Sequence, residues 1–284
     1  MTTFIKNILD ITDQYDLIIS DVFGVIHDGQ KRLPNVISFY SHIADKVALL
    51  TNDGRCTDTV QSHLKSFDFE KEKHYKDIFT SGYFLNQFYL NNSLKNPKCY
   101  ILDEYLTPSI ASVNLVTSIP GLEVVDNIEE AQFCFVAGVS KLTLDQMNDN
   151  PELIKTLEKL LSKQCKLLCP NPDKLVVYGD AGLIPLAGYI ADMFAEIGGE
   201  VISFGKPAKY PYEFILNKYN PSKALMIGDT IDTDIKGAID VGIDSLLIGT
   251  GVTKHSWQPS LDITSFNDWL TNQSLQPTWY IDQF

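Results

Sequence analysis

The sequence has little positive charge for its length. Its 284 residues include 23 Lys and Arg against 36 Asp and Glu, which gives a formal net charge of −13. Nucleic acids and anionic membranes are drawn to basic surfaces, so this balance argues against either as a partner. Any site for a phosphate group must therefore be a local cationic pocket in an acidic protein.

Long apolar runs are also missing. No segment approaches the roughly 20 apolar residues that a membrane-spanning helix needs, so we expect no membrane span. We expect no secretory signal either, because the N-terminal segment MTTFIKNILDITDQY lacks a basic region followed by an apolar core. These absences predict a soluble, cytoplasmic protein.

The cysteines do not form a metal-binding pattern. The sequence contains five of them and no CxxC pair. Zinc sites and disulfide frameworks are recognised by paired spacings, so we predict reduced thiols buried in strands and helices. The five are Cys56, Cys99, Cys134, Cys165 and Cys169.

The sequence does contain short apolar runs that end abruptly in polar residues. Such runs are typical of strands buried on both faces of a parallel sheet, and ligands collect at the carboxyl ends of those strands. Residues 17–19 end in Ser20 and Asp21, and residues 46–50 end in Thr51 and Asn52. Each polar group reads equally well as a helix cap or a turn former, so neither motif decides a function alone.

Two more runs of this kind follow later in the chain. Residues 201–204 lead into Lys206, and residues 224–227 lead into the acidic segment GDTIDTDI at 228–235. We place both runs in the same sheet as the first two. Clustered aspartates repel one another unless a cation lies between them, which favours a hard metal ion. The joint order of an aspartate, a Thr-Asn pair, a lysine and an acidic cluster predicts a phosphoryl-transfer site.

The chain is predicted to have an α/β fold with two units. A polar segment rich in Asn and Pro at 91–97 is the most evident boundary. Beyond it, about a hundred residues read as further strands and helices. We predict a doubly wound parallel-sheet core from residues 1–93 and 198–284, which ends in a helix at 266–270. An α/β cap domain is inserted at 94–197.

Taken together, these motifs resemble those of the haloacid dehalogenase superfamily, in particular its class IIA branch of sugar-phosphatase-like and nitrophenyl-phosphatase-like enzymes. CPNPD at 169–173 resembles the TNPD-type cap motif of this branch, although Cys169 and Pro170 depart from its usual start. The resemblance implies a Rossmann-like core and a cap that sets the substrate. The other segments that carry it are DVFGVIHDG at 21–29, TNDGR at 51–55, GKP at 205–207 and GDTIDTDI at 228–235.

The resemblance also implies a role for each candidate site residue. Asp21 is the expected nucleophile, which forms an aspartyl-phosphate. Magnesium would be bound by Asp21, Asp229 and the backbone carbonyl of Phe23. Asp234 would lie in the outer shell of the ion or steer Lys206. The resemblance therefore implies a magnesium-dependent hydrolase.

Further residues are assigned to the substrate, a small phosphorylated metabolite that includes sugar phosphates among the candidates. Class IIA relatives often dimerise through the cap, so a homodimer of this kind is expected. The groups implied to hold the phosphoryl oxygens are Thr51, Asn52 and Lys206. Substrate contacts are also assigned to Arg55, which matches a pocket arginine of some relatives, and to Asn171 and Asp173 of the cap motif.

One position departs from the family pattern. The phosphatases of this family carry a second aspartate two residues after the nucleophile, which protonates the leaving oxygen and later activates water. This chain has Phe23 there. A phenyl ring cannot transfer a proton, and such acid-base help is typically worth about 10²–10⁴ in rate. Metal binding through a backbone carbonyl survives any substitution.

Four interpretations follow from Phe23. In the first, the enzyme acts on substrates with good leaving groups, such as aryl phosphates. In the second, another proton carrier, His27 or a cap residue, replaces the aspartate. In the third, the chain is a weak or inactive phosphatase kept as a phosphometabolite-binding protein. The fourth is a dehalogenase, because the metal-free dehalogenases of this superfamily tend to have an aromatic residue at this position. They lack the acidic fourth motif, which would be costly to bury without a cation, so this interpretation ranks below a phosphatase.

Overall fold

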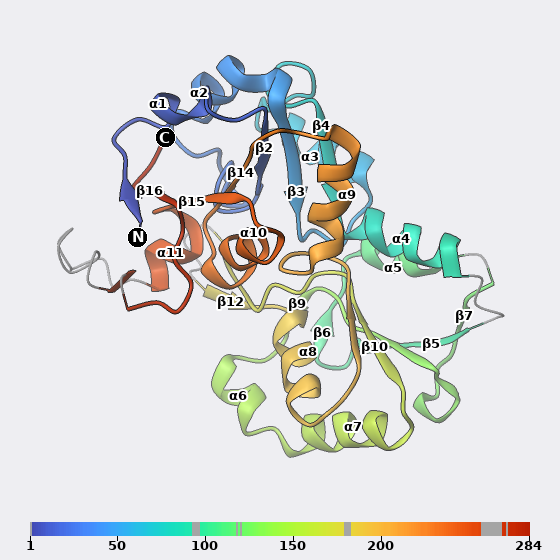
Figure 1. Ribbon diagram of the computed structural model, residues 1–284. Helices are drawn as coiled ribbons and strands as arrows, with labels where there is room; N and C mark the ends of the chain where they lie inside the picture. The colour runs from blue at the N-terminus through green and yellow to red at the C-terminus, as the bar shows by residue number, and fades with distance from the viewer. Residues whose placement is uncertain are drawn as a thin grey trace.

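A computed structural model of this chain shows two parallel β-sheets with helices packed around them (Figure 1). Within the described residues, no helix is both long and apolar enough to cross a membrane. The structure describes residues 2–92, 97–117, 119, 121–178, 183–256, 269–270 and 272–284.

The larger sheet has seven parallel strands in the order β1-β16-β15-β14-β2-β3-β4. From β2 the chain winds outward through β3 to β4, and from β14 it winds the other way through β15 to β16. This is the predicted doubly wound sheet, and β2 and β14 meet at its topological switch point. In chain order the strands are β1 (Thr3–Phe4), β2 (Leu17–Ser20), β3 (Val47–Thr51), β4 (Asp77–Thr80), β14 (Ala224–Gly228), β15 (Asp244–Ile248) and β16 (Trp279–Ile281).

Helices cover both faces of this sheet. Alternate residues of β2 and β3 point to opposite sides, as the two-residue period of a strand requires. Ile18 packs in a cluster with residues of α2 and α3, whereas Ile19 packs in a cluster with residues of α4, α9 and α10. These helices are α2 (Val36–Ile43), α3 (Thr57–Lys65), α4 (Ser81–Asn92), α9 (Lys209–Tyr219) and α10 (Lys236–Val241).

The smaller sheet has five parallel strands in the order β13-β10-β8-β5-β7. Its helices α6, α7 and α8 lie together at the far side of the molecule from α1 (Leu9–Thr12) and α2 (Figure 1). The strands are β5 (Lys98–Ile101), β7 (Glu123–Val124), β8 (Phe133–Phe135), β10 (Lys166–Cys169) and β13 (Val201–Ser203). The helices of this part are α5 (Ile110–Thr117), α6 (Leu144–Asn148), α7 (Pro151–Ser162) and α8 (Ala187–Glu196).

The prediction that the strand at 201–204 returns to the larger sheet is wrong. β13 pairs with β10 in the smaller sheet, with Cys169 opposite Ser203. The reason is that β10, α8 and β13 form a parallel strand-helix-strand unit, whose second strand lies beside its first. The division into a core and a cap stays a prediction, and residues 201–203 group with the cap sheet.

The two sheets share part of their hydrophobic core. The cluster that contains Ile19 and Leu50 of the larger sheet also contains Phe133, Phe135 and Leu168 of the smaller one. This contact holds the smaller sheet against the larger one. The smaller sheet and its helices, from β5 to β13 (98–203), are called the second part of the chain from here on. This part also contains two short antiparallel pairs, β6 (Leu106–Thr107) with β9 (Val139–Ser140) and β11 (Leu175–Val177) with β12 (Leu183–Pro185).

Other local predictions were confirmed only in part. Four of the five cysteines are buried free thiols, as predicted, but Cys56 is exposed because it precedes α3 as its N-cap residue. The helix α8 begins only at Ala187, because the preceding Leu183–Pro185 pairs as β12. Of the helix predicted at 266–270, only residues 269–270 lie within the described chain.

Candidate active site

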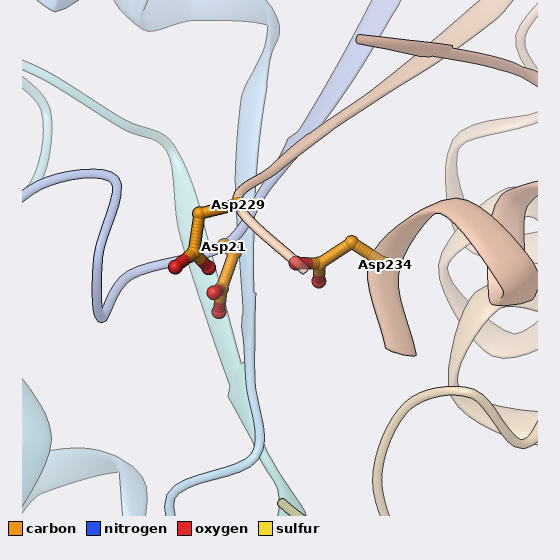
Figure 2. A group of neighbouring side chains, drawn as sticks. All are labelled: Asp21, Asp229 and Asp234. Carbon is orange, nitrogen blue, oxygen red and sulfur yellow. The ribbon is translucent and has the colours of Figure 1, made fainter. Parts of the chain in front are cut away.

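Three aspartates that are distant in sequence meet at the switch point of the larger sheet (Figure 2). Asp21 follows β2, Asp229 follows β14, and Asp234 lies in the π-helical turn η4 (Ile231–Ile235). One carboxylate oxygen from each lies within 4.8 Å of those from the other two. All three side chains are buried. Clustered carboxylate oxygens are the ligands that a hard divalent cation prefers, so these residues fit such an ion.

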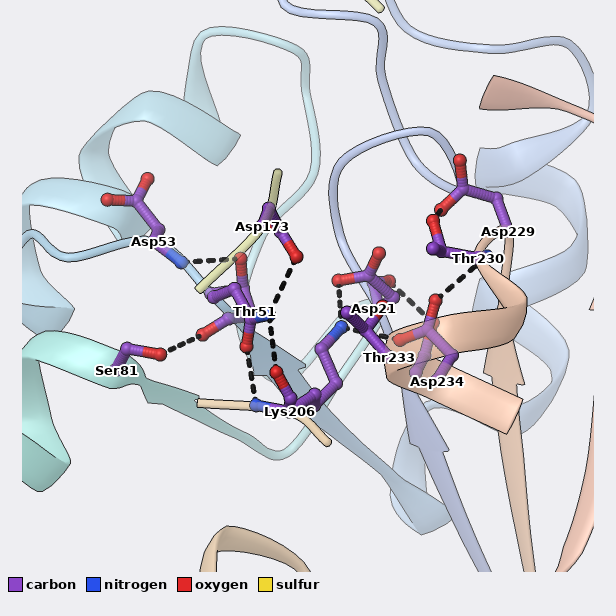
Figure 3. A network of polar contacts seen from close by, with 12 residues as sticks. Asp21, Thr51, Asp53, Ser81, Asp173, Lys206, Asp229, Thr230, Thr233 and Asp234 are labelled. Carbon is purple, nitrogen blue, oxygen red and sulfur yellow. Dashed lines mark hydrogen bonds and ion pairs between the residues drawn. The ribbon is translucent and has the colours of Figure 1, made fainter. Parts of the chain in front are cut away.

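Lys206 brings a positive charge to the aspartates. Its Nζ lies 2.5 Å from Asp21 Oδ1 and 2.7 Å from Asp234 Oδ1, and only 2% of the lysine side chain is exposed (Figure 3). Burial by itself lowers the pKa of Lys206, but the charges of Asp21 and Asp234 outweigh it and raise the pKa above its usual value. Lys206 therefore stays protonated. It reaches the site from the segment after β13, which crosses over from the smaller sheet.

One lysine does not balance the acidic groups around it. Burial raises the pKa of Asp21 to about 7, although the charge of Lys206 opposes this. Burial and the charges of Asp21 and Asp234 raise the pKa of Asp229 well above its usual value. A bound cation would offset both the burial and the repulsion. The charge distribution thus agrees with the geometry in favouring a divalent ion.

Asp229 is enclosed by two loops that leave room only for glycine. A Cβ on Gly24, whose φ is +82°, would lie 2.3 Å from Asp229 Oδ2, and a Cβ on Gly251 would lie 1.9 Å from the same atom. The backbone N–H of Val252 donates to Asp229 Oδ2 at 2.6 Å. The hydroxyl of Thr253 donates to the backbone oxygen of Asp229. These contacts fix the orientation of the carboxylate.

None of the predictions from the sequence included this second loop. Residues 249–253 read GTGVT and follow β15, which is the strand next to β14. The signal was available, because the segment is another polar, glycine-rich end of a buried strand. The hydroxyl of Thr250 donates to the backbone oxygen of Gly24 at 2.6 Å and so joins the two loops.

Thr51 is the last residue of β3, the other neighbour of β2, and Asn52 follows it; the two side chains have different surroundings. Thr51 lines the cavity described below. Within the described chain Asn52 does not line it; instead, its side chain binds the backbone of Lys206. Asn52 Oδ1 accepts from the Lys206 N–H at 2.6 Å, and Asn52 Nδ2 donates to the Lys206 carbonyl at 3.0 Å. The geometry of Asn52 is that of a positioning residue for Lys206, and its direct contact with substrate stays a prediction.

Arg55 and Asn171 each form hydrogen bonds with residues close to them in the sequence. The Nε of Arg55 lies 2.9 Å from both carboxylate oxygens of Asp53. Asn171 Oδ1 accepts from the backbone N–H of Asp173 at 3.0 Å. Neither Arg55 nor Asn171 is among the described residues that line the cavity. The substrate contacts of Arg55 and Asn171 stay predictions.

Phe23 lines the cavity, and its ring packs against other aromatic side chains. It meets His27 edge to face, with 5.0 Å between ring centroids, and stacks with Tyr178 at 6.5 Å. His27 stacks on Phe67, and its Nδ1 accepts from the backbone N–H of Gly29 at 3.0 Å. Burial lowers the pKa of His27 to about 4. Among the described residues His27 does not line the cavity, and its ring contacts are those of a packing residue; a role as proton carrier stays a prediction.

A cavity of about 610 Å³ opens at the aspartates between the two sheets. Its floor includes Asp21, Phe23, Thr51 and Asp229 from the larger sheet. A ligand that reaches Asp21 therefore also meets the second part of the chain. The wall from that part is largely apolar and includes Pro172, Leu175, Val176, Val177, Ala191 and Val201.

Comparison with known families identifies this arrangement. A family model described as haloacid dehalogenase-like hydrolase matches residues 15–242. The chain belongs to this family. A second model of HAD-like hydrolases matches residues 203–283. The matched region contains all four motifs, from Asp21 to Asp234, and it confirms the resemblance inferred from the sequence.

Individual relatives of this haloacid dehalogenase-like hydrolase match it over most of its length. The dihydroxyacetone phosphatase of Corynebacterium glutamicum is 23% identical over 88% of this chain and 89% of its own. Among solved structures, a haloacid dehalogenase-like hydrolase from Brucella suis has a TM-score of 0.78, 24% identity and 99% coverage of both chains. A glycerol phosphate phosphatase from Mycobacterium tuberculosis in complex with magnesium has a TM-score of 0.68 and 20% identity, and the match covers 96% of this chain and 77% of that one. The structural likenesses show the shared fold.

Proposed function

We propose that this hydrolase is a magnesium-dependent phosphatase that releases phosphate from small phosphorylated metabolites through a phosphorylated Asp21. The observation that carries the proposal is the convergence of Lys206 and three buried aspartates, two of which, Asp21 and Asp229, line one cavity. Two relatives support it, a dihydroxyacetone phosphatase and a glycerol phosphate phosphatase whose structure contains magnesium. Both act on small phosphate esters by name, which agrees with the cavity volume of about 610 Å³.

Each polar group has a part in this reaction. Asp21 attacks phosphorus, and Lys206 orients its carboxylate and offsets the negative charge that develops. Magnesium would be held by Asp21, Asp229 and the backbone carbonyl of Phe23, and when bound it would neutralise phosphoryl oxygens. Asp234 holds Lys206 in place through the 2.7 Å ion pair. Thr51 lines the cavity beside Asp21, where its hydroxyl can donate to a phosphoryl oxygen.

The second part of the chain is proposed to act as the cap that selects the substrate. It contributes most of the apolar wall of the cavity, opposite the aspartates. Asn52 links the two parts, because its Nδ2 donates to Asp173 Oδ1 at 2.7 Å as well as to Lys206. The homodimer through the cap and the cytoplasmic location stay predictions.

Removal of divalent ions should abolish hydrolysis. With p-nitrophenyl phosphate as substrate, we expect chelator to lower the rate at least about 10²-fold and added magnesium to restore it, because charge neutralisation by the ion is lost. Magnesium should also raise the thermal unfolding temperature, since it relieves repulsion between Asp21 and Asp229. The Asp229→Asn variant is expected to lose this shift. Full activity in chelator would contradict the proposal.

Phe23→Asp should raise the turnover of alkyl phosphates more than that of aryl phosphates. A carboxyl group at position 23 can protonate a poor leaving group, and this is expected to increase kcat/KM by up to about 10². Phe23→Asn is the matched control, because it removes the same ring contacts with His27 and Tyr178 but carries no transferable proton. If both variants lose activity on every substrate, Phe23 has a role of its own.

A further inference from the structure

We propose that Asp173, contributed by the second part of the chain, is the general acid and base that replaces the aspartate missing at position 23. This inference rests on the proposed phosphatase function and deepens it. A phosphatase that acts on ordinary alkyl phosphates needs a proton donor for the leaving oxygen, and Phe23 cannot be one. The group must face the cavity, reach it with an uncommitted oxygen atom, and be held in place.

Asp173 lines the cavity from the second part of the chain. It lines the same cavity as Asp21, Phe23 and Asp229. The residue is partly exposed, and the cavity reaches it. Figure 3 shows the Asp173 side chain on the same network of polar contacts as Thr51 and Lys206. A leaving group that extends from phosphorus toward the second part of the chain therefore meets this carboxyl group.

Hydrogen bonds hold one side of Asp173 and leave the other available. Its Oδ1 accepts from Asn52 Nδ2 at 2.7 Å, and its backbone N–H donates to Asn171 Oδ1 at 3.0 Å. Within the described part of the chain, Asp173 forms no ion pair, and its Oδ2 has no hydrogen-bond partner. Asn52 and Asn171 thus act as positioning residues for Asp173, and this role requires no contact with the substrate.

The electrostatic surroundings suit proton transfer in both directions. Burial raises the pKa of Asp173 to about 6, although the charge of Lys206 and the hydrogen bond from Asn52 lower it. A group whose pKa lies near the working pH both donates and accepts a proton readily. Other acidic groups at the cavity are less suited. Asp192 is bound to Lys174 at 2.6 Å, and Asp232 is exposed to solvent.

Asp173 takes part in two steps, the transfer of the phosphoryl group to Asp21 and the hydrolysis of phosphorylated Asp21. A carboxylate oxygen of Asp21 bonds to phosphorus, and the bond from phosphorus to the leaving oxygen breaks with its electron pair on that oxygen. The leaving oxygen takes the proton of the Asp173 carboxyl group and departs as an alcohol. A water oxygen then attacks phosphorus and gives a proton to the Asp173 carboxylate. The bond between phosphorus and Asp21 breaks, its electron pair returns to Asp21, and inorganic phosphate is released.

The test is Asp173→Asn, which keeps an oxygen that accepts from Asn52 but removes the proton. With glycerol 3-phosphate, kcat/KM should fall about 10²-fold or more. With p-nitrophenyl phosphate, kcat/KM should change by less than about threefold, because nitrophenolate leaves without a proton. The ratio of kcat/KM on p-nitrophenyl phosphate to kcat/KM on glycerol 3-phosphate should therefore be moderate in the wild type. In the Asp173→Asn variant this ratio should be much larger.

A second signature separates this role from a structural one. Water attack on phosphorylated Asp21 lacks its base in Asp173→Asn, so p-nitrophenyl phosphate should give a rapid burst of one nitrophenolate per active site before slow steady turnover. The burst also shows that the variant is folded. The double variant with Phe23→Asp should recover most of the lost kcat/KM on glycerol 3-phosphate, and this gain should exceed that of Phe23→Asp in the wild type.

Asp192→Asn is the matched control, because it removes another carboxylate from the same wall. It should change the rates on both substrates by the same factor. If Asp173→Asn behaves in that way and shows no burst, Asp173 is not the proton carrier. If wild-type protein with magnesium hydrolyses neither substrate, the phosphatase function itself fails. The two failures are therefore distinguishable.

Discussion

The Asp21→Asn variant should release phosphate from no substrate, with a rate at least about 10⁴-fold below that of the wild type. An amide does not attack phosphorus, so the covalent step is lost. The substitution preserves the size of the side chain, and its oxygen can still accept a hydrogen bond from Lys206, which lies 2.5 Å from Asp21 Oδ1 in the wild type. The loss should therefore appear in catalysis before it appears in folding.

Measurements of phosphate release and of ligand binding together decide between enzyme and binding protein. We expect Asp21→Asn to bind glycerol 3-phosphate in calorimetry with an affinity close to that of the wild type. Wild-type protein should incorporate radioactive phosphate from a labelled substrate, and the variant should not. Turnover by the variant at the wild-type rate would exclude Asp21 as the nucleophile. Binding by both proteins without turnover by either would favour the phosphometabolite-binding protein.

Lys206→Met should lower the free energy of unfolding by about 3–5 kcal/mol. The substitution leaves Asp21 and Asp234 buried, close together and without the lysine that contacts both. Removal of one member of a buried ion cluster lowers the free energy of unfolding by more than the whole cluster adds to it, because the remaining charges are uncompensated. Urea unfolding in the presence of chelator measures the effect, since a bound ion would compensate part of the charge.

Lys218→Met is the matched control for this prediction. Lys218 Nζ lies 2.6 Å from Asp77 Oδ2, a distance similar to those of Lys206, but 44% of the lysine side chain is exposed. This pair should contribute at most about 1 kcal/mol, because solvent screens it. Asp234→Asn added to Lys206→Met should recover part of the lost stability. Equal losses for the two lysine variants would contradict the importance of burial at Lys206.

Local sequence patterns were sufficient to predict where the chemistry lies. Asp21 and Asp229 each end an apolar run, and apolar runs that end in polar residues mark strand ends whatever the rest of the fold does. Residues 249–253 also follow an apolar run and are polar and glycine-rich, so the loop that fixes Asp229 can be predicted from the same pattern. Predictions based on which strands pair were less secure, as β13 shows, because pairing depends on residues distant in the chain.

The side-chain roles show the same limit. Asn52, Arg55 and Asn171 have the chemistry of substrate-binding residues, and the sequence does not indicate which partner each will bind. In the folded chain Arg55 binds Asp53, and Asn52 and Asn171 hold Lys206 and Asp173. His27 is placed against Phe67 and away from the cavity. A polar side chain takes the partner that its neighbours in space present, and those neighbours come from other elements.

The sequence by itself determined the family, the α/β fold class and the identity of the central aspartates, because short motifs and the periodicity of strands are local properties of the chain. Only the tertiary structure decided that Lys206 reaches Asp21 from the segment after the smaller sheet and that Asp173 lines the same cavity as Phe23. These relations join residues more than a hundred positions apart. They depend on how the two sheets pack through their shared core, which no local pattern records.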